Sequence, residues 1–207
     1  MKLNKKLLAT GVLAASMFAG QAWGAVSAEE AAKLGNSLTP MGAEKAGNGG
    51  AIPAWTGGLT TPPPGYNNDG IYVNPFADEQ PKFTIDQSNV EQYKDNLSPG
   101  QVAMIERYDD YFMPVYETRR TAACPEHVYE KFRQNALTAE LLDNGNGVRD
   151  TIMTSPFPIP KNGLEAIWNH ITRWRGVYLT RRASEIAVQV NGDYSLVTVQ
   201  QEVEFNY

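Results

Sequence analysis

A stretch rich in proline and glycine, residues 40–65, limits the folds open to this 207-residue chain more than any other feature. Its five prolines and seven glycines exclude a long helix and a central strand, because proline lacks an amide donor and glycine weakens regular structure. Large apolar residues are nevertheless too frequent in and after it for a solvated linker. They are Ile52, Trp55, Leu59, Tyr66, Ile71, Tyr72, Val73 and Phe76. We therefore expect residues 25–82 to form an irregular segment that packs on a core through its aromatic side chains, with a flexible tether as the alternative.

The N-terminus has the plan of a secretory signal peptide. Lys2, Lys5 and Lys6 precede an uncharged apolar run over residues 7–19, and small residues follow in "GQAWGAVSA". The apolar run is shorter than the roughly 20 residues of a membrane-spanning helix. We predict a signal peptide over residues 1–24, cleaved after Gly24 or, as second choice, after Ala28; an uncleaved anchor is the alternative. The protein is then expected in the periplasm, soluble or peripheral to the outer membrane.

Cysteine content and charge narrow the class of protein further. Cys124 is the only cysteine, so no intrachain disulfide forms and no lipoprotein cysteine follows the apolar run. A small buried side chain beside Pro125 is favoured over a reactive or interchain thiol. Loss of the three leader lysines takes the formal charge from −5 to about −8. Such an acidic chain is a poor binder of nucleic acid, and it has no second long apolar run that predicts a transmembrane segment.

Residues 83–172 have the patterns of helices. Ser98, Pro99 and Gln101 form an N-cap, a first helical position and a capping-box partner. Another helix is predicted to start at Pro125 and to end before the turn sequence "DNGNG". Its buried face is predicted to consist of Val128, Tyr129, Phe132 and Ala136.

A third helix follows a proline-rich entry, "SPFPIP", which holds the chain extended. Asn162 and Glu165 predict an N-cap with its reciprocal partner. The spacing i, i+3, i+4 and i+7 then predicts that one apolar face of this helix is buried. That face consists of Leu164, Ile167, Trp168 and Ile171.

Residues 173–207 are predicted to begin an antiparallel sheet around a turn at Asn191–Gly192. Apolar residues change parity along the first arm, which predicts a bulge or sharp bend near residues 182–185. A two-residue or a three-residue turn fits equally well. Because an isolated hairpin is only marginally stable, we expect further sheet to follow in a longer polypeptide. The fold class is α+β.

The sequence carries no recognisable catalytic or metal-binding motif. Ser195 lacks a nucleophile elbow, and His127 and His170 lie on different predicted helices, without the close spacing of zinc ligands. The sequence "DNGNGVRD" has glycines where a calcium loop needs oxygen ligands. We therefore predict no catalytic residues, no metal and no cofactor.

One cluster of basic residues lies in this acidic chain. Arg173, Arg175, Arg181 and Arg182 fall within ten residues that contain no acid, with Trp174 among them. They are predicted to contact an anionic headgroup or a partner's carboxylates. The alternative, which we favour, is that these arginines pair within the chain with acids such as Asp109, Asp110 or Glu117.

Four long stretches resemble the bacterial family called domain of unknown function 1329, often labelled outer membrane lipoprotein-sorting protein. They are "LGNSLTPMGAEKAGNGGAIPAWTGGL", "NPFADEQPKFTI", "YETRRTAACPEHVYE" and "PFPIPKNGLEAIWNH". The resemblance implies that this chain is the N-terminal half of a longer protein. It also implies the fold of periplasmic lipoprotein carriers, an incomplete antiparallel half-barrel with helices over its concave face. Family members are often encoded near efflux-type transporters, and no catalytic residues are established for them.

The function we expect is that of a non-catalytic periplasmic carrier or accessory protein that binds a lipid-like hydrophobic molecule. The alternatives are an interaction module that docks on a membrane or efflux-type transporter and, third, an enzyme whose catalytic residues follow Tyr207. The predicted ligand lining is Trp168, Val177, Leu179, Ile186, Val188, Val197 and Val199. The predicted headgroup or partner contacts are Arg173, Trp174, Arg175, Arg181 and Arg182.

Overall fold

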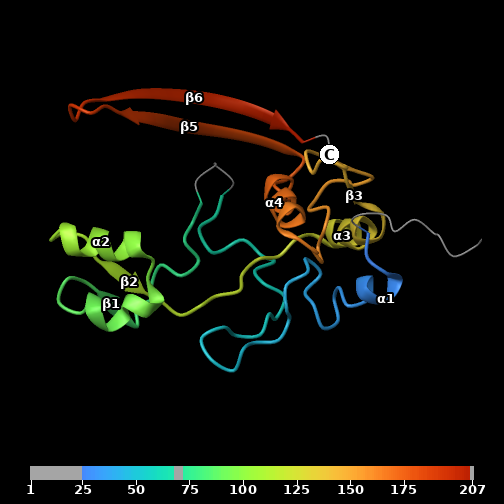
Figure 1. Ribbon diagram of the computed structural model, residues 1–207, viewed down its shortest axis with the longest axis horizontal. Helices are drawn as coiled ribbons and strands as arrows, with labels where there is room; N and C mark the ends of the chain where they lie inside the picture. Colours follow the sequence, from blue (N-terminus) through green and yellow to red (C-terminus); the bar gives the residue numbers. More distant parts are fainter. Residues whose placement is uncertain (1–24, 68–71, 206–207) are drawn as a thin grey trace, which may run out of the picture. The chain divides into compact units, whose positions relative to one another are not determined.

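The computed structural model describes residues 25–67 and 72–205, so the predicted signal peptide over residues 1–24 lies outside the described residues. The chain divides into two compact units. Of the described residues, the first comprises 25–32, 130–177 and 205, and the second comprises 33–67, 72–129 and 178–204. Figure 1 labels the helices and strands of both units.

A small core in the second unit forms between one antiparallel strand pair and two helical segments. Strand β1 (Phe83–Ile85) pairs with β2 (Met113–Val115), and Phe83 lies opposite Val115. The 3-10 helix η1 (Val90–Asn96) and helix α2 (Pro99–Arg107) complete the core. Its buried residues are Ile85, Val90 and Ile105, and its partly buried ones are Tyr93, Leu97, Val102, Tyr111, Met113 and Val115.

The predicted start of α2 is confirmed in full. The Ser98 hydroxyl accepts the amide of Gln101 at 3.3 Å, and the Ser98 amide donates to the Gln101 side chain at 2.8 Å. Pro99 takes the first helical position, where its missing N–H leaves no bond unmade.

The proline- and glycine-rich segment is held chiefly by one arginine. The guanidinium of Arg120 donates to the carbonyl oxygen of Glu44 at 2.6 Å. It also donates to the carbonyls of Lys45, Ala46 and Pro53 at 3.3–3.4 Å. An irregular segment cannot pair its carbonyls in a ladder, so a side chain with five donors in a planar fork replaces that ladder.

The residues after Arg120 hold the same segment through their backbone. Leu59 donates its amide to the carbonyl of Thr121 at 2.9 Å, and the Trp55 indole donates to the carbonyl of Ala122 at 2.9 Å. Gly58 has a φ of 73°, and a Cβ there would lie 2.4 Å from the Ala122 carbonyl oxygen. Of the predicted aromatic contacts, Trp55 acts through its N–H, whereas Tyr72 is 86% exposed. At Trp55, a hydrogen bond thus contributes to what we had expected of aromatic packing.

The first unit contains helix α1 (Ala28–Ala31), strand β3 (Glu140–Leu141) paired with β4 (Val148–Arg149), and helix α4 (Gly163–Ile171). Helix α3 (Glu126–Thr138) runs across the division between the units. The four residues predicted as its buried face, Val128, Tyr129, Phe132 and Ala136, are all buried. Residues 83–172, which we expected to be helical, thus also hold four short strands.

The C-terminal hairpin is long and regular. Strand β5 (Tyr178–Val188) pairs with β6 (Tyr194–Glu204) without interruption, so the predicted bulge near residues 182–185 is wrong. Gln189 donates to the carbonyl of Asp193 at 2.8 Å, and Gly192 has a φ of 90°. These features select the three-residue turn, with glycine in the left-handed position.

The described residues therefore combine helices with three two-stranded antiparallel sheets, as an α+β assignment requires (Figure 1). Within residues 25–67 and 72–205, no helix is both long and apolar enough to cross a membrane.

Replacing Arg120 by alanine should loosen the segment over residues 44–59. Each bond from a charged donor contributes about 1.5–3 kcal/mol, so amides such as that of Trp55 should exchange at least tenfold faster with solvent. Hydrogen exchange followed by mass spectrometry measures this. The matched control is Arg119→Ala, which removes a surface ion pair with Glu79 that contributes about 1 kcal/mol or less. Equal protection in the two variants would show that Arg120 does not hold the segment.

Candidate functional site

Helix α4 turns its polar side inward and its apolar side outward. Glu165 is 2% exposed and Thr172, which ends the helix, is 9% exposed. Leu164, Ile167 and Ile171 are 51%, 50% and 46% exposed. Three of the four residues predicted as the buried face of this helix therefore lie outside, and that prediction is wrong. Of the four, only Trp168 is half-buried.

The buried carboxyl group of Glu165 is matched by donors at the start of α4. It accepts the amide of Lys161 at 2.6 Å and the side-chain amide of Asn162 at 3.2 Å. Asn162 in turn accepts the amide of Glu165 at 3.0 Å, so the predicted N-cap is confirmed. The reciprocal bond differs from that of a capping box, because the Glu165 carboxyl accepts the amide of Lys161, which precedes the N-cap, instead of the amide of Asn162 itself. A buried carboxylate persists only where donors of this kind satisfy it.

Further polar bonds fix the inward face of the helix. The Asn169 side chain bonds both backbone groups of Phe157, accepting from its amide at 2.8 Å and donating to its carbonyl at 2.6 Å. Phe157 is itself 2% exposed. The Trp168 indole donates to the carbonyl of Gly145 at 3.0 Å. Trp168, predicted to line a ligand site, thus joins α4 to the loop between β3 and β4.

The arginines that follow α4 bond its last carbonyls. Arg173 donates to the carbonyl of His170 at 2.6 Å, and Arg175 donates to that of Ile171 at 3.2 Å. The guanidinium of Arg175 also lies 4.6 Å from the centre of the Phe205 ring. Cations at a helix C-terminus complement its dipole, so these two side chains have a structural role.

Two of the three acids that we had considered as partners of the arginines, Asp109 and Glu117, make other bonds. Lys82 lies 2.9 Å from Glu117, and its hydrogen bond and charge lower the pKa of that carboxyl. Asp109 accepts from Gln87 at 3.0 Å. On the hairpin, Arg181 donates to Gln201 at 2.6 Å, and Arg182 lies opposite Gln200. Trp174 is half-buried.

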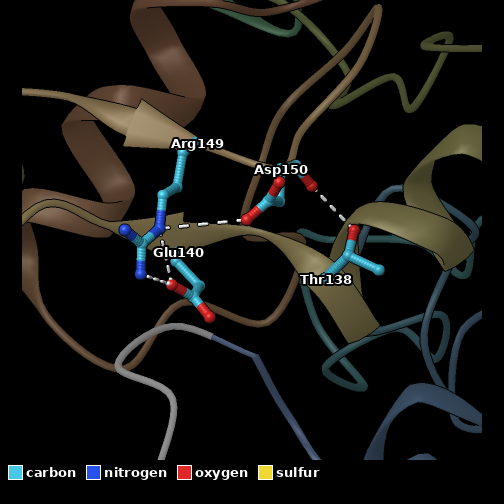
Figure 2. A network of polar contacts seen from close by, with 4 residues as sticks. All are labelled: Thr138, Glu140, Arg149 and Asp150. Carbon is cyan, nitrogen blue, oxygen red and sulfur yellow. Dashed lines mark hydrogen bonds and ion pairs between the residues drawn. The ribbon is translucent and has the colours of Figure 1, made fainter.

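An open groove of about 550 Å³ lies in the first unit. It is lined by Ala25, Gln134, Leu137, Thr138, Glu140, Asp150, Thr151 and Ile152. Figure 2 shows the polar network at its rim, where Arg149 donates to Glu140 at 2.7 Å and lies 3.8 Å from Asp150. The bond to Glu140 is the main cause of a raised pKa at Arg149. The Thr138 hydroxyl donates to the carbonyl of Asp150 at 2.7 Å.

The chain beside this groove is strained and held by one buried amide. Asp150 and Met153 have φ values of 54° and 68°; this left-handed region is adopted more readily by aspartate than by methionine, for which it is uncommon. The side chain of Asn135, which is 0% exposed, accepts the amide of Ile152 at 3.0 Å. It also donates to the carbonyls of Ile152, Thr154 and Ser155 at 3.0–3.3 Å. These bonds fix the conformation that the strained residues adopt.

The hairpin divides the remaining predicted lining residues between two faces. Paired residues lie on the same face, so Leu179, opposite Val203, shares a face with Val199, opposite Ala183. Val197, opposite Glu185, belongs to the same face, whereas Val177 lies just before β5. Ile186 and Val188, opposite Leu196 and Tyr194, lie on the other face. The predicted lining residues on the hairpin strands therefore lie on two opposite faces.

No group of three or more metal-ligating side chains occurs among residues 25–67 and 72–205. The Cys124 sulfur lies 3.9 Å from that of Met41, and burial raises the pKa of the thiol. Cys124 was predicted to be buried and is half-buried; a raised pKa lowers the fraction of reactive thiolate.

Comparison with known proteins shows the family. Residues 84–207 match the family described as protein of unknown function, DUF1329, and this chain belongs to it. It is 55% identical over 207 residues to the uncharacterized protein PA3922 of Pseudomonas aeruginosa. The match covers 99% of this chain and 46% of the relative, so the chain spans about half the length of that protein. No solved structure matches the chain.

Sequence reasoning missed Asn135, Glu165 and Arg120. Asn135 had a signal, because it occurs three residues after Phe132 on the apolar face of α3, where a polar residue needs partners. Glu165 was recognised as a capping residue, but its burial was not. Arg120 has no local pattern, because its partners lie more than 60 residues earlier in the chain.

Replacing Asn135 by aspartate should destabilise the first unit by at least about 3 kcal/mol, because it removes the donors to three carbonyls and buries an unpaired charge. Chemical denaturation measures the free energy of unfolding. The control is Asn144→Asp, at an exposed turn where the side chain only accepts, from the amide of Asn146. That variant should stay within about 0.5 kcal/mol of the original. A similarly small loss of unfolding free energy in Asn135→Asp would show that Asn135 does not stabilise the first unit through these bonds.

Proposed function

We propose that the protein is a non-catalytic periplasmic carrier or accessory protein that binds a lipid-like hydrophobic molecule. The observation that supports this most is the hairpin, which exposes apolar side chains on both faces. Ile186, Val188 and Leu196 are 60%, 76% and 55% exposed on one face. Val197 is 57% exposed on the other. Ile186, Val188 and Leu196 are neighbours near the turn, and soluble proteins rarely leave a contiguous apolar patch uncovered.

The free energy of such binding comes from removing an acyl chain from water, about 0.8 kcal/mol for each buried methylene. A chain of a dozen or so methylenes would therefore offset the entropic cost of association. The hairpin would form part of an incomplete antiparallel half-barrel, with this chain as the N-terminal half of a longer family member. The relative, about twice as long, is consistent with that arrangement.

The alternative from another class is a module that docks on a membrane or efflux-type transporter. The same exposed strands would then be covered by protein, because unpaired strand edges readily add further strands. The two proposals differ in what co-purifies with the protein, a lipid in the first and a polypeptide in the second.

Native mass spectrometry of the periplasm-purified protein should show an adduct of lipid mass. The variant Ile186→Asp should lose the adduct if the face that bears Ile186 contacts the ligand, since it places a charge there. Met104→Asp, at a 42% exposed position on α2, is the matched control and should keep the adduct. A bare protein mass that persists after incubation with phospholipid would count against the carrier proposal. A crosslinked polypeptide without lipid would favour the docking module.

A further inference from the structure

The outward face of α4 carries three exposed apolar residues one helical turn apart. Leu164, Ile167 and Ile171 follow the spacing i, i+3 and i+7, so they form one stripe along a nine-residue helix. We name them the α4 stripe. The hydrogen bonds of Glu165, Trp168 and Asn169 on the inward side of the helix fix the orientation of the stripe. The stripe is therefore already formed, and no partner is needed to turn it outward.

The exposed charged residues that neighbour the α4 stripe in the sequence are all basic. Between Lys161 and Gly176 the only acidic residue is Glu165, which is buried on the inward side. The basic residues in the same range are Lys161, Arg173 and Arg175, in a chain with a formal charge of −5. Although Arg173 bonds a helix carbonyl, its guanidinium stays exposed and keeps its charge.

We propose that the α4 stripe docks on an anionic lipid surface. A helix with one apolar side, flanked by arginines and a tryptophan, has the composition of elements that lie in the interface of a bilayer. The stripe would enter the acyl boundary, and Arg173 would face the phosphates. A neutral protein partner would need no such charge, and a second copy would bring two equally basic ends together.

The proposed docking of the α4 stripe on a bilayer does not depend on the proposed binding of a hydrophobic molecule at the hairpin. A carrier could bind its ligand without docking on a bilayer, and the stripe could dock without any ligand. The two proposals therefore fail independently, because native mass spectrometry tests the first and vesicle binding tests the second.

Flotation with vesicles tests the docking. The protein should float with vesicles of equal parts phosphatidylglycerol and phosphatidylcholine, more at low than at high salt, and much less with phosphatidylcholine alone. Ile167→Asp should weaken binding to the anionic vesicles by at least about tenfold. Arg173→Glu should weaken it by at least about fivefold and reduce the dependence on salt. Residues 1–24 are common to all variants, so any affinity they add cancels in the comparison.

The controls are Met104→Asp and Arg107→Glu, which make the same chemical changes on α2. Both should float like the original protein, and circular dichroism should show that every variant is folded. Absence of binding to anionic vesicles would overturn the proposal, and so would equal losses in the stripe variants and the controls. A dimer that Ile167→Asp dissociates, without vesicle binding, would show that a second copy covers the stripe instead.

Discussion

The buried carboxyl group of Glu165 decides which way α4 faces, and the surface of the first unit depends on that orientation. Leaving three aliphatic side chains half exposed costs about 3 kcal/mol in total. Turning the helix to bury them would place Glu165 outside and leave the amide of Lys161 and the backbone of Phe157 without their partners. Each lost bond at a buried group costs about 1–3 kcal/mol, so the bonds together outweigh the exposed apolar surface.

Polar side chains hold the irregular parts of both units in the same way. Arg120 collects four carbonyls of the proline- and glycine-rich segment, and Asn135 collects three carbonyls beside the groove. A chain with so much proline and glycine cannot satisfy its backbone through helices and ladders. Buried or half-buried side chains with several donors take over that role. A few side chains with several hydrogen bonds thus stabilise these irregular parts, and the loss of any one of them would destabilise a whole segment.

Local features were predictable from sequence because their causes are local. The N-caps at Ser98 and Asn162, the buried face of α3 and the hairpin around Gly192 all follow from residues within one or two turns of each other. The face of α4 was not predictable in this way, because periodicity reports amphipathicity and not which side meets the core. The change of parity in β5 was read as a bulge on the assumption of one buried face. The hairpin instead has apolar residues on both faces.

The central claim is that α4 keeps its polar side inward and its apolar side outward. Single cysteines at two positions on the helix, introduced in a background with Cys124→Ser, test it most directly through their rate of reaction with a thiol reagent. We expect Ile167→Cys to react nearly as fast in the folded protein as in denaturant. Thr172→Cys, on the inward side, should react much more slowly until the protein unfolds. Faster reaction at position 172 than at position 167 would show that the helix packs the other way round.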